Sequence, residues 1–288
     1  MPLGTFGVIG PYNFPFMIPL WSIPYAVATG NCVVLKSSSE VPLSMMRFVE
    51  LCDEAGIPPG VVNLVNGGRD VVGAMLDHPD IEGITFVGST PVAKDVIYKR
   101  CGETGKRVIA QGGAANFMVI MEDCNVKATI PAMMTSFFGN TGQRCLAGQT
   151  LIVVGEDDAF YNDFMDRMTE TASKIVIGNG LDESVQMGPM REPSKKETVL
   201  KYIDEGLADG ATLRLDGRKY TLRDGCADYC CLGPTIMENV KRQNSVVREE
   251  IFGPTMGVMR VKTLDEAIEI CNENQFHNGD AIFTNSGK

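Results

Sequence analysis

An alternation of strand-like and helix-like segments is the feature that most restricts the fold of this chain. Residues 32–36 (CVVLK) form a β-branched run, and residues 41–56 follow with apolar side chains at helical spacing. Repeated strand–helix units of this length predict a parallel sheet with helices on its faces. The expected strands of this first part are 4–10, 32–36, 61–65, 83–88 and 106–111, and the expected helices are 41–56, 69–79 and 89–102.

The alternation continues after the glycine pair Gly112–Gly113. We therefore predict an α/β fold with two domains, residues 1–111 and residues 112–288. Ligands of such sheets bind at the carboxyl ends of the strands. The expected strands of the second part are 116–121, 149–154 and 249–261, and the expected helices are 126–139, 158–176, 194–210 and 265–274.

The charge balance argues against some classes of partner. The formal charge is −10, from 26 basic and 36 acidic residues. A negative surface repels phosphate backbones, so we predict no nucleic-acid partner. No uninterrupted apolar run reaches the length that crosses a bilayer, so we predict no membrane span.

The cysteines indicate free thiols rather than a disulfide framework. The chain has nine of them at irregular spacing, which favours a reducing compartment. We expect the cytoplasm, or the mitochondrion if the source is eukaryotic and a presequence is missing from this chain. Cys226, Cys230 and Cys231 lie close together without a fourth ligand nearby, so a thiol-rich loop is favoured over a zinc site. His78 and His277 are far apart in the sequence, and no metal site is predicted.

Cys145 stands out among the nine because of the segment around it, FFGNTGQRCLAGQ. The simpler interpretation is that Cys145 is a small buried apolar residue, as most free cysteines are. Gly142, Gly148 and the adjacent Arg144 favour a nucleophile instead. A guanidinium beside the sulfur is also expected to favour the thiolate.

Five short motifs resemble, in the same order, those of the aldehyde dehydrogenase superfamily. They are GPYNFP, VVLKSSSEVP, FVGST, GQRC and EEIFGP, and together they extend over almost the whole chain. Within the superfamily, GQRC, KIVIGNGLDE, DHPDIEGITFVGS and GPTI are most similar to methylmalonate-semialdehyde dehydrogenases. Those enzymes oxidise malonate or methylmalonate semialdehyde and pass the acyl group to coenzyme A.

The resemblance implies different functions for the two predicted domains. Residues 1–111 would form part of a Rossmann-like NAD-binding domain, and residues 112–288 a catalytic domain that is incomplete at its C-terminus. The similarity begins inside the family's usual first domain and stops before its oligomerisation arm. We therefore expect a central fragment of a longer protein, and the full-length parent would be a homo-oligomer.

The resemblance also assigns catalytic roles. Cys145 would add to the aldehyde carbonyl, lose a hydride to the nicotinamide and hold the product as a thioester. The Asn13 amide and the Cys145 backbone N–H would bind the oxyanion, although a plain turn residue is the alternative for Asn13. Arg144 would bind the substrate's carboxylate, with a structural ion pair as its alternative.

Cofactor contacts are implied at the ends of several strands. Lys36 matches the lysine that binds the adenosine ribose, and Ser89 would cap a helix whose N–H groups suit a pyrophosphate. Glu250 matches the carboxylate that binds the nicotinamide ribose, with Phe252 packing near the ring. The remaining residues assigned to cofactor binding are Pro11, Phe14, Ser39 and Gly67.

Two positions depart from the common pattern of the family. Gln111, or Ala110 if the alignment shifts by one residue, occupies the place of the glutamate that activates water in hydrolytic members. Neither side chain accepts a proton at neutral pH, so coenzyme A is the expected acyl acceptor. Ser39 replaces the glutamate that repels a 2′-phosphate, so NADP is possible, although the resemblance favours NAD.

Three functions therefore remain open at this point. The first is a coenzyme A-acylating semialdehyde dehydrogenase acting on a small-molecule aldehyde. The second is a hydrolytic, NAD(P)-dependent aldehyde dehydrogenase with a displaced base such as Glu250. The third is a non-catalytic fragment with a binding or structural role.

Overall fold

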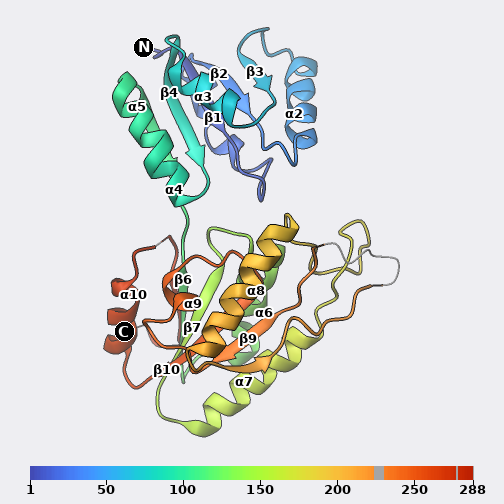
Figure 1. The fold of residues 1–288 in the computed structure, drawn as a ribbon, viewed down its shortest axis with the longest axis vertical. Helices are drawn as coiled ribbons and strands as arrows, with labels where there is room; N and C mark the ends of the chain where they lie inside the picture. Colours follow the sequence, from blue (N-terminus) through green and yellow to red (C-terminus); the bar gives the residue numbers. More distant parts are fainter. Residues whose placement is uncertain (224–229, 277, 288) are drawn as a thin grey trace. The chain divides into compact units, whose positions relative to one another are not determined.

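The computed structural model describes residues 1–223, 230–276 and 278–287. The chain divides into two compact units, Met1–Gly113 and Ala114–Lys288 (Figure 1). Each unit is built around a largely parallel sheet with helices beside it. The predicted α/β fold class is confirmed.

The first unit contains a five-stranded sheet in the order β3-β2-β1-β4-β5. All neighbouring strands are parallel, as the strand–helix alternation predicted. The chain runs outward in one direction through β2 and β3 and in the other through β4 and β5, so a topological switch point lies between β1 and β4. The strands are β1 (Thr5–Ile9), β2 (Cys32–Lys36), β3 (Val62–Val65), β4 (Ile81–Val87) and β5 (Arg107–Gln111).

Helices pack on both faces of this sheet. Helices α1 (Ile23–Ala28) and α2 (Leu43–Glu54) share one apolar cluster with β1 and β2. Helix α3 (Arg69–Asp77) and the helical segment 90–104 share another cluster with β1 and β4. That segment was predicted as one helix. It is continuous in Figure 1, but comprises α4 (Thr90–Val92), a π-helical stretch (Ala93–Tyr98) and α5 (Lys99–Thr104).

The second unit has a six-stranded sheet in its described residues, in the order β11-β6-β7-β10-β9-β8. Its neighbouring strands are parallel except for β8, which runs antiparallel to β9. β6 and β7 are registered so that Asn116 pairs with Gly148. The strands are β6 (Asn116–Met121), β7 (Gly148–Val154), β8 (Thr212–Leu215), β9 (Thr235–Glu238), β10 (Thr255–Val261) and β11 (Ala281–Phe283).

Two layers of helices cover this second sheet (Figure 1). On β7, Leu151 and Val153 pack into one apolar cluster, whereas Ile152 and Val154 pack into the other. A strand buried on both faces reads as a continuous apolar run, which is why residues 149–154 were recognisable as a strand. The first cluster contains α6 (Val126–Phe138) and α7 (Asp158–Ser173), and the second α8 (Pro193–Ala208), α9 (Ser245–Arg248) and α10 (Leu264–Glu273).

Some short elements were not predicted. β8 and β9 have four residues each, too few to show an alternating pattern. The expected strand 249–261 begins only at Thr255, since Phe252 adopts a left-handed backbone conformation (φ 57°) that interrupts extended structure. Among the described residues, no helix is both long and apolar enough to cross a membrane.

Candidate active site

The candidate cofactor residues of the first unit lie just after the strands of its sheet. Because these strands are parallel, their carboxyl ends meet at one edge, where ligands of such sheets bind. Chain segments far apart in sequence thus reach a single edge. Pro11, Asn13 and Phe14 follow β1, Lys36 and Ser39 end and follow β2, Gly67 follows β3, and Ser89 follows β4.

Lys36 is unusual because a lysine is rarely buried. Its side chain is 8% exposed at the end of β2. Burial lowers the pKa of its ammonium group, and the negative charge of Glu40 partly offsets this. Nearby, the Ser39 hydroxyl donates to the Gly67 carbonyl at 2.9 Å, which ties the ends of β2 and β3 together.

Ser89 occupies the N-cap position of α4, as predicted. Its backbone is extended (φ −70°, ψ 146°), and its hydroxyl makes no capping hydrogen bond. The next residue, Thr90, accepts a hydrogen bond from the Gly113 N–H at 2.8 Å. The hydroxyl of Ser89 is therefore not used to cap the helix.

A strained turn precedes Cys145 in the second unit. Asn140, Thr141 and Gly142 have φ values of 52°, 57° and 68°. Left-handed conformations of residues other than glycine cost about 1–3 kcal/mol each and persist only when their surroundings fix them. The Thr141 hydroxyl provides such an anchor, since it donates to the Gly188 carbonyl at 2.7 Å.

Gly142 also lies against a second strained segment. A Cβ atom at Gly142 would lie 2.0 Å from the carbonyl oxygen of Gly253, so only glycine fits. Gly253 follows Phe252, which has a positive φ of its own. The loop that carries Cys145 and the EEIFGP segment are therefore in direct backbone contact.

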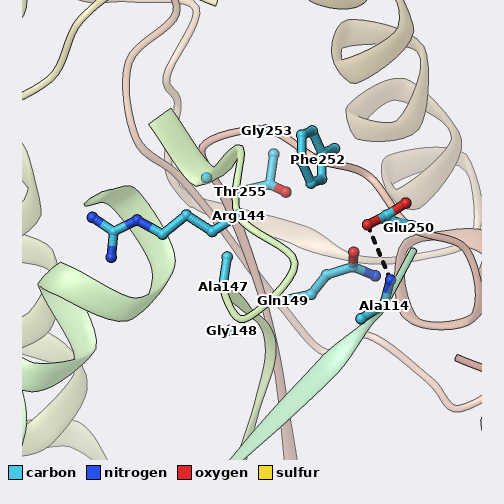
Figure 2. A pocket seen from close by; sticks show the side chains of 10 residues that line it. Ala114, Arg144, Ala147, Gly148, Gln149, Glu250, Phe252, Gly253 and Thr255 are labelled. Atoms are coloured by element: carbon cyan, nitrogen blue, oxygen red, sulfur yellow. Dashed lines mark hydrogen bonds between the residues drawn. The ribbon is translucent and has the colours of Figure 1, made fainter. Parts of the chain in front are cut away.

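A small pocket lies at this contact (Figure 2). Its volume is about 10 Å³, close to what one water molecule needs. The Thr255 hydroxyl in its wall is buried and has no hydrogen-bond partner among the described residues. The lining residues are Ala114, Gly142, Arg144, Ala147, Gly148, Gln149, Glu250, Phe252, Gly253 and Thr255.

Glu250 is held in the wall of this pocket by a backbone amide. Its Oε1 accepts a hydrogen bond from the Ala114 N–H at 3.0 Å (Figure 2). Burial raises the pKa of its carboxyl, and this hydrogen bond opposes the shift. The carboxyl therefore holds a proton to higher pH than an exposed glutamate does.

Gln149 fixes the backbone on both sides of Glu250. Its amide donates to the carbonyls of Val246 (3.1 Å) and Glu249 (2.6 Å) and accepts from the Ile251 N–H (2.9 Å). The side chain is 7% exposed. Sequence reasoning did not single out Gln149, although a polar residue at the start of the apolar run QTLIVV was the available signal.

Cys145 is half-buried, and two asparagine side chains hold its peptide group. Its carbonyl accepts hydrogen bonds from Asn116 Nδ2 (2.9 Å) and Asn278 Nδ2 (3.2 Å). Burial raises the pKa of its thiol, and the negative charge of Glu250 adds to the rise. The N–H groups of Cys145 and Leu146 and the Asn278 amide act in the opposite direction.

The side chain of Arg144 is hydrogen-bonded to α6. Figure 2 shows its side chain pointing away from Glu250, toward the neighbouring helix. There, Nη1 donates to the Thr135 carbonyl at 3.3 Å, and the guanidinium packs over Gly139. Burial raises the pKa of the Cys145 thiol, and Arg144 is not among the groups that act on that pKa in the described residues. The expectation that Arg144 favours the thiolate therefore stays a prediction.

The alternative considered for Arg144, an ion pair, is not seen within the described residues either. Its Nε is buried without a hydrogen-bond partner there. The side chain therefore keeps donor capacity that the described part of the protein does not use.

Among the described residues, no histidine and no cysteine lines the pocket itself. Cys230 and Cys231 are each 1% exposed and pack in the two apolar clusters of the second unit. His78 ends α3 and accepts a hydrogen bond from the Asp80 N–H at 3.2 Å. Cys226 and His277 lie outside the described residues.

Residues 1–288 match the aldehyde dehydrogenase family. The chain belongs to the aldehyde dehydrogenase family. This confirms the resemblance carried by the five motifs, and it covers both compact units. The loops around Cys145 and Glu250 contain two of those motifs, GQRC and EEIFGP.

Curated relatives are similar over nearly the full chain. Malonate-semialdehyde dehydrogenase 2 of Bacillus thuringiensis (strain Al Hakam) is 44% identical over 286 residues, which are 99% of this chain. Malonate-semialdehyde dehydrogenase 1 of Oceanobacillus iheyensis is 45% identical over 287 residues. The chain spans 58% of the length of each of these relatives.

Solved structures give the same family. The methylmalonate-semialdehyde dehydrogenase of Oceanimonas doudoroffii matches with a TM-score of 0.95 and 36% identity, over 99% of this chain and 58% of its own. A Sinorhizobium meliloti 1021 protein solved in complex with NAD also has a TM-score of 0.95 and 36% identity, over 99% of this chain and 57% of its own.

Proposed function

We propose that this chain carries the nucleophile and part of the cofactor site of an enzyme that oxidises malonate or methylmalonate semialdehyde with NAD and passes the acyl group to coenzyme A. The observation that carries the proposal is the setting of the Cys145 thiol. It lies in the GQRC motif, in a strained loop held by Asn116 and Asn278 and in backbone contact with the Glu250 segment. The names of the relatives supply the substrate class.

The strand ends of the first unit support the NAD half of this proposal. Lys36, at the end of β2, presents a buried ammonium group, and Ser89, after β4 of the same parallel sheet, presents a hydroxyl not used for capping. The ammonium group of Lys36 suits contact with a ribose, and the hydroxyl of Ser89 suits contact with a pyrophosphate. NAD is preferred because the Sinorhizobium meliloti relative was solved with it, while Ser39 leaves NADP as the alternative.

The proposed reaction begins at the Cys145 sulfur. The thiolate donates an electron pair to the aldehyde carbon, and a C–S bond forms while the carbonyl oxygen gains negative charge. The N–H of Cys145 and the Asn13 amide are the proposed donors to that oxygen; losing one such donor commonly costs about 2.7–4 kcal/mol. Glu250 and Phe252 are the proposed neighbours of a nicotinamide, which would supply the acceptor for the hydride; as that hydride leaves the aldehyde carbon, the oxyanion would re-form the C=O bond and a thioester would remain on Cys145.

Arg144 is the proposed partner of the substrate's carboxylate. A guanidinium carries five N–H donors, so it can bind a carboxylate bidentately. Support comes from its unused Nε and from the long 3.3 Å hydrogen bond of Nη1, which is weak enough to be exchanged. In this arrangement the residue beside the nucleophile would select aldehydes with an acidic group.

Release of the acyl group to coenzyme A follows from the lack of a base at the expected place. Gln111 ends β5, and neither it nor Ala110 can accept a proton from water. The thioester would then persist until a better nucleophile than water, such as a thiol, attacks it. A homo-oligomeric parent remains part of the proposal, and the bacterial relatives favour the cytoplasm over the mitochondrion.

Hydrolysis of the thioester is the second candidate. The specific observation in its favour is Glu250, whose raised pKa suits a general base and whose charge acts on the Cys145 thiol. Dependence on coenzyme A separates the two candidates.

The test is NADH formation from malonate semialdehyde with and without coenzyme A, with Cys145→Ala as control. We expect turnover that requires both coenzyme A and Cys145. Sustained turnover without coenzyme A would show that water attacks the thioester, and a fully active Cys145→Ala variant would reject the nucleophile.

Substrate selection by Arg144 has its own test in the Arg144→Leu variant. We expect turnover of malonate semialdehyde to fall much more than turnover of an uncharged aldehyde such as propanal. An equal fall for both aldehydes would mean that Arg144 does not bind the carboxylate.

A further inference from the structure

The residue of interest is Asn116, which begins β6 and is fully buried. Its Nδ2 donates to the carbonyls of Cys145 (2.9 Å) and Ala147 (2.8 Å), and its Oδ1 accepts from the Gly279 N–H (2.9 Å). Both neighbours of Nδ2 are acceptors and the neighbour of Oδ1 is a donor, so a flipped amide would lose all three bonds. The hydrogen bonds therefore define one orientation of this side chain.

The loop that carries Cys145 is held on both sides of the nucleophile. Before Cys145, the Thr141 hydroxyl fixes the strained turn through the Gly188 carbonyl. After it, Asn116 binds the carbonyls of Cys145 and Ala147. Each peptide group is planar, so a bound carbonyl fixes the orientation of its whole peptide. The backbone at the nucleophile is thus restrained from its C-terminal side by one side chain.

Asn116 is itself attached to rigid structure. β6 lies between β11 and β7 in the sheet, and Asn116 is in register with Gly148. The segment before β11 is tied to the same strand by the Gly279 bond to Asn116 and by Asp280, which accepts from the Phe117 N–H at 2.7 Å. Groups held by strands are positioned more precisely than groups held by loops. The position of the Cys145 loop is therefore set from the sheet.

The bonds of Asn116 go to backbone carbonyls, so their effect is on position. An attacking atom must come within about 3–3.5 Å of its target with aligned orbitals, and a shift of about 1 Å can cost about a hundredfold in rate. Asn278 also donates to the Cys145 carbonyl (3.2 Å), so loss of Asn116 would weaken this attachment and remove the bond to the Ala147 carbonyl. We therefore expect slower attack at each site.

We propose that Asn116 is a positioning residue for the nucleophile: its amide ties the Cys145 and Ala147 carbonyls to β6 and to the segment before β11, and so sets where the Cys145 sulfur stands for attack. Asn116 touches neither aldehyde nor cofactor in this role. The consequence for turnover rests on the proposed function. The attachment of the loop does not, since it needs no substrate.

The test is a single turnover without coenzyme A at saturating malonate semialdehyde and NAD, in which the rate constant and the amplitude of the NADH burst are recorded separately. A displaced sulfur lowers the rate constant at every folded site, whereas loss of folded protein lowers the amplitude alone. We expect Asn116→Ala to lower the rate constant about ten- to a hundredfold with little loss of amplitude. The aldehyde concentration that gives half the maximal burst rate should stay within about twofold, because Asn116 is not proposed to touch the aldehyde.

Asn116→Ser is the milder variant, for the case in which Asn116→Ala leaves little folded protein. A serine hydroxyl has one O–H and can donate to one carbonyl in place of two. The burst rate constant of Asn116→Ser should therefore lie between those of the parent chain and Asn116→Ala. A rate constant equal to that of the parent chain in both variants would overturn the proposal.

Asn274→Ala is the matched control in the same unit. Asn274 is 8% exposed, and its amide donates to the Val247 carbonyl at 2.8 Å and accepts from the Phe276 N–H at 2.8 Å. The control therefore also removes buried amide bonds between two chain segments, but none to the Cys145 loop. Its burst rate constant should match that of the parent chain. An equal fall in Asn274→Ala and Asn116→Ala would overturn the positioning role.

Hydrogen exchange of the Cys145 loop tests the attachment without any substrate. The N–H groups of Ala147 and Gly148 are hydrogen-bonded within the loop and to α6, so both amides are protected while the loop keeps its path. In Asn116→Ala their exchange should accelerate about tenfold or more, and in Asn274→Ala it should change little. Unchanged exchange of both amides in Asn116→Ala would contradict the attachment.

The two measurements separate this inference from the proposed function. If the parent chain forms NADH through Cys145 and Asn116→Ala keeps the burst rate constant, only the role of Asn116 fails. If the parent chain forms no NADH from malonate semialdehyde, the proposed function fails, and exchange at Ala147 and Gly148 decides whether Asn116 holds the loop.

Discussion

The candidate residues of the two units are positioned in different ways. In the first unit, Lys36 ends one strand of a parallel sheet, Gly67 and Ser89 follow two others, and the backbone topology alone brings them to one edge. In the second unit, Cys145 and Glu250 lie in loops whose paths depend on strained backbone and buried side-chain amides. The first arrangement should tolerate single substitutions better than the second.

The largest effect that tests this difference is expected at Gly142. Gly142→Ala would place Cβ 2.0 Å from the Gly253 carbonyl, at a φ of 68° that disfavours any side chain. We expect a loss of about 3 kcal/mol or more in the stability of the second unit. Hydrogen exchange resolved to peptides in each unit measures it.

Gly105→Ala is the matched control in the first unit. Gly105 has nearly the same backbone conformation (φ 71°), but nothing lies within 4 Å of its Cβ position. Only the conformational cost of about 1 kcal/mol should remain. Equal losses of stability in Gly142→Ala and Gly105→Ala would show that the backbone contact between Gly142 and Gly253 does not contribute to the effect.

The next effect concerns the amide that holds the Glu250 segment. Methionine has a shape similar to that of glutamine, but Gln149→Met leaves the Val246 and Glu249 carbonyls and the Ile251 N–H without their hydrogen-bond partner. Buried groups left unpaired cost about 1–3 kcal/mol each, so exchange in residues 246–251 should accelerate strongly. Gln186→Met, which removes an exposed bond from the Val176 N–H, should change exchange little.

A smaller effect links Glu250 to the nucleophile. Because the charge of Glu250 raises the Cys145 thiol pKa, Glu250→Gln should lower that pKa and speed alkylation of Cys145 at neutral pH several-fold. Glu249→Gln, at the adjacent residue, is the control and should have a weaker effect. Slower alkylation in Glu250→Gln would contradict an electrostatic coupling of this sign.

Glu250 also predicts a dependence of stability on pH. Its carboxyl pKa is raised by burial, so the folded chain binds this proton more tightly than the unfolded chain does. Stability should therefore fall as pH rises from the ordinary glutamate pKa through the raised one. Urea denaturation across this window should show a shallower fall for Glu250→Gln, and parallel curves would contradict the assignment.

The smallest effect is expected in the first unit. Ser39→Ala removes the hydrogen bond to the Gly67 carbonyl at an exposed position. Its cost should be about 1 kcal/mol or less, because water replaces the lost partner. If Ser39→Ala lost as much stability as Gln149→Met, side-chain hydrogen bonds would also be needed to position the residues at the sheet edge of the first unit.

Much of the fold could be predicted because it rests on periodic patterns. The apolar run at β7 and the strand–helix alternation of the first unit are properties of short windows of sequence. Gln149 and Asn278 were missed because a single polar residue shows no period, and its partners lie 97 and 133 positions away along the chain. The direction of Arg144 was missed since packing over Gly139 sets it.

The central claim, a Cys145 thioester that waits for coenzyme A, is tested most directly by a single-turnover measurement. Malonate semialdehyde and NAD are mixed with the chain without coenzyme A, and NADH is counted against the acyl adduct on the Cys145 peptide. The account predicts a burst of about one NADH per active thiol, an adduct on Cys145, and renewed NADH formation when coenzyme A is added. Continuous NADH formation with no adduct on Cys145 would contradict it.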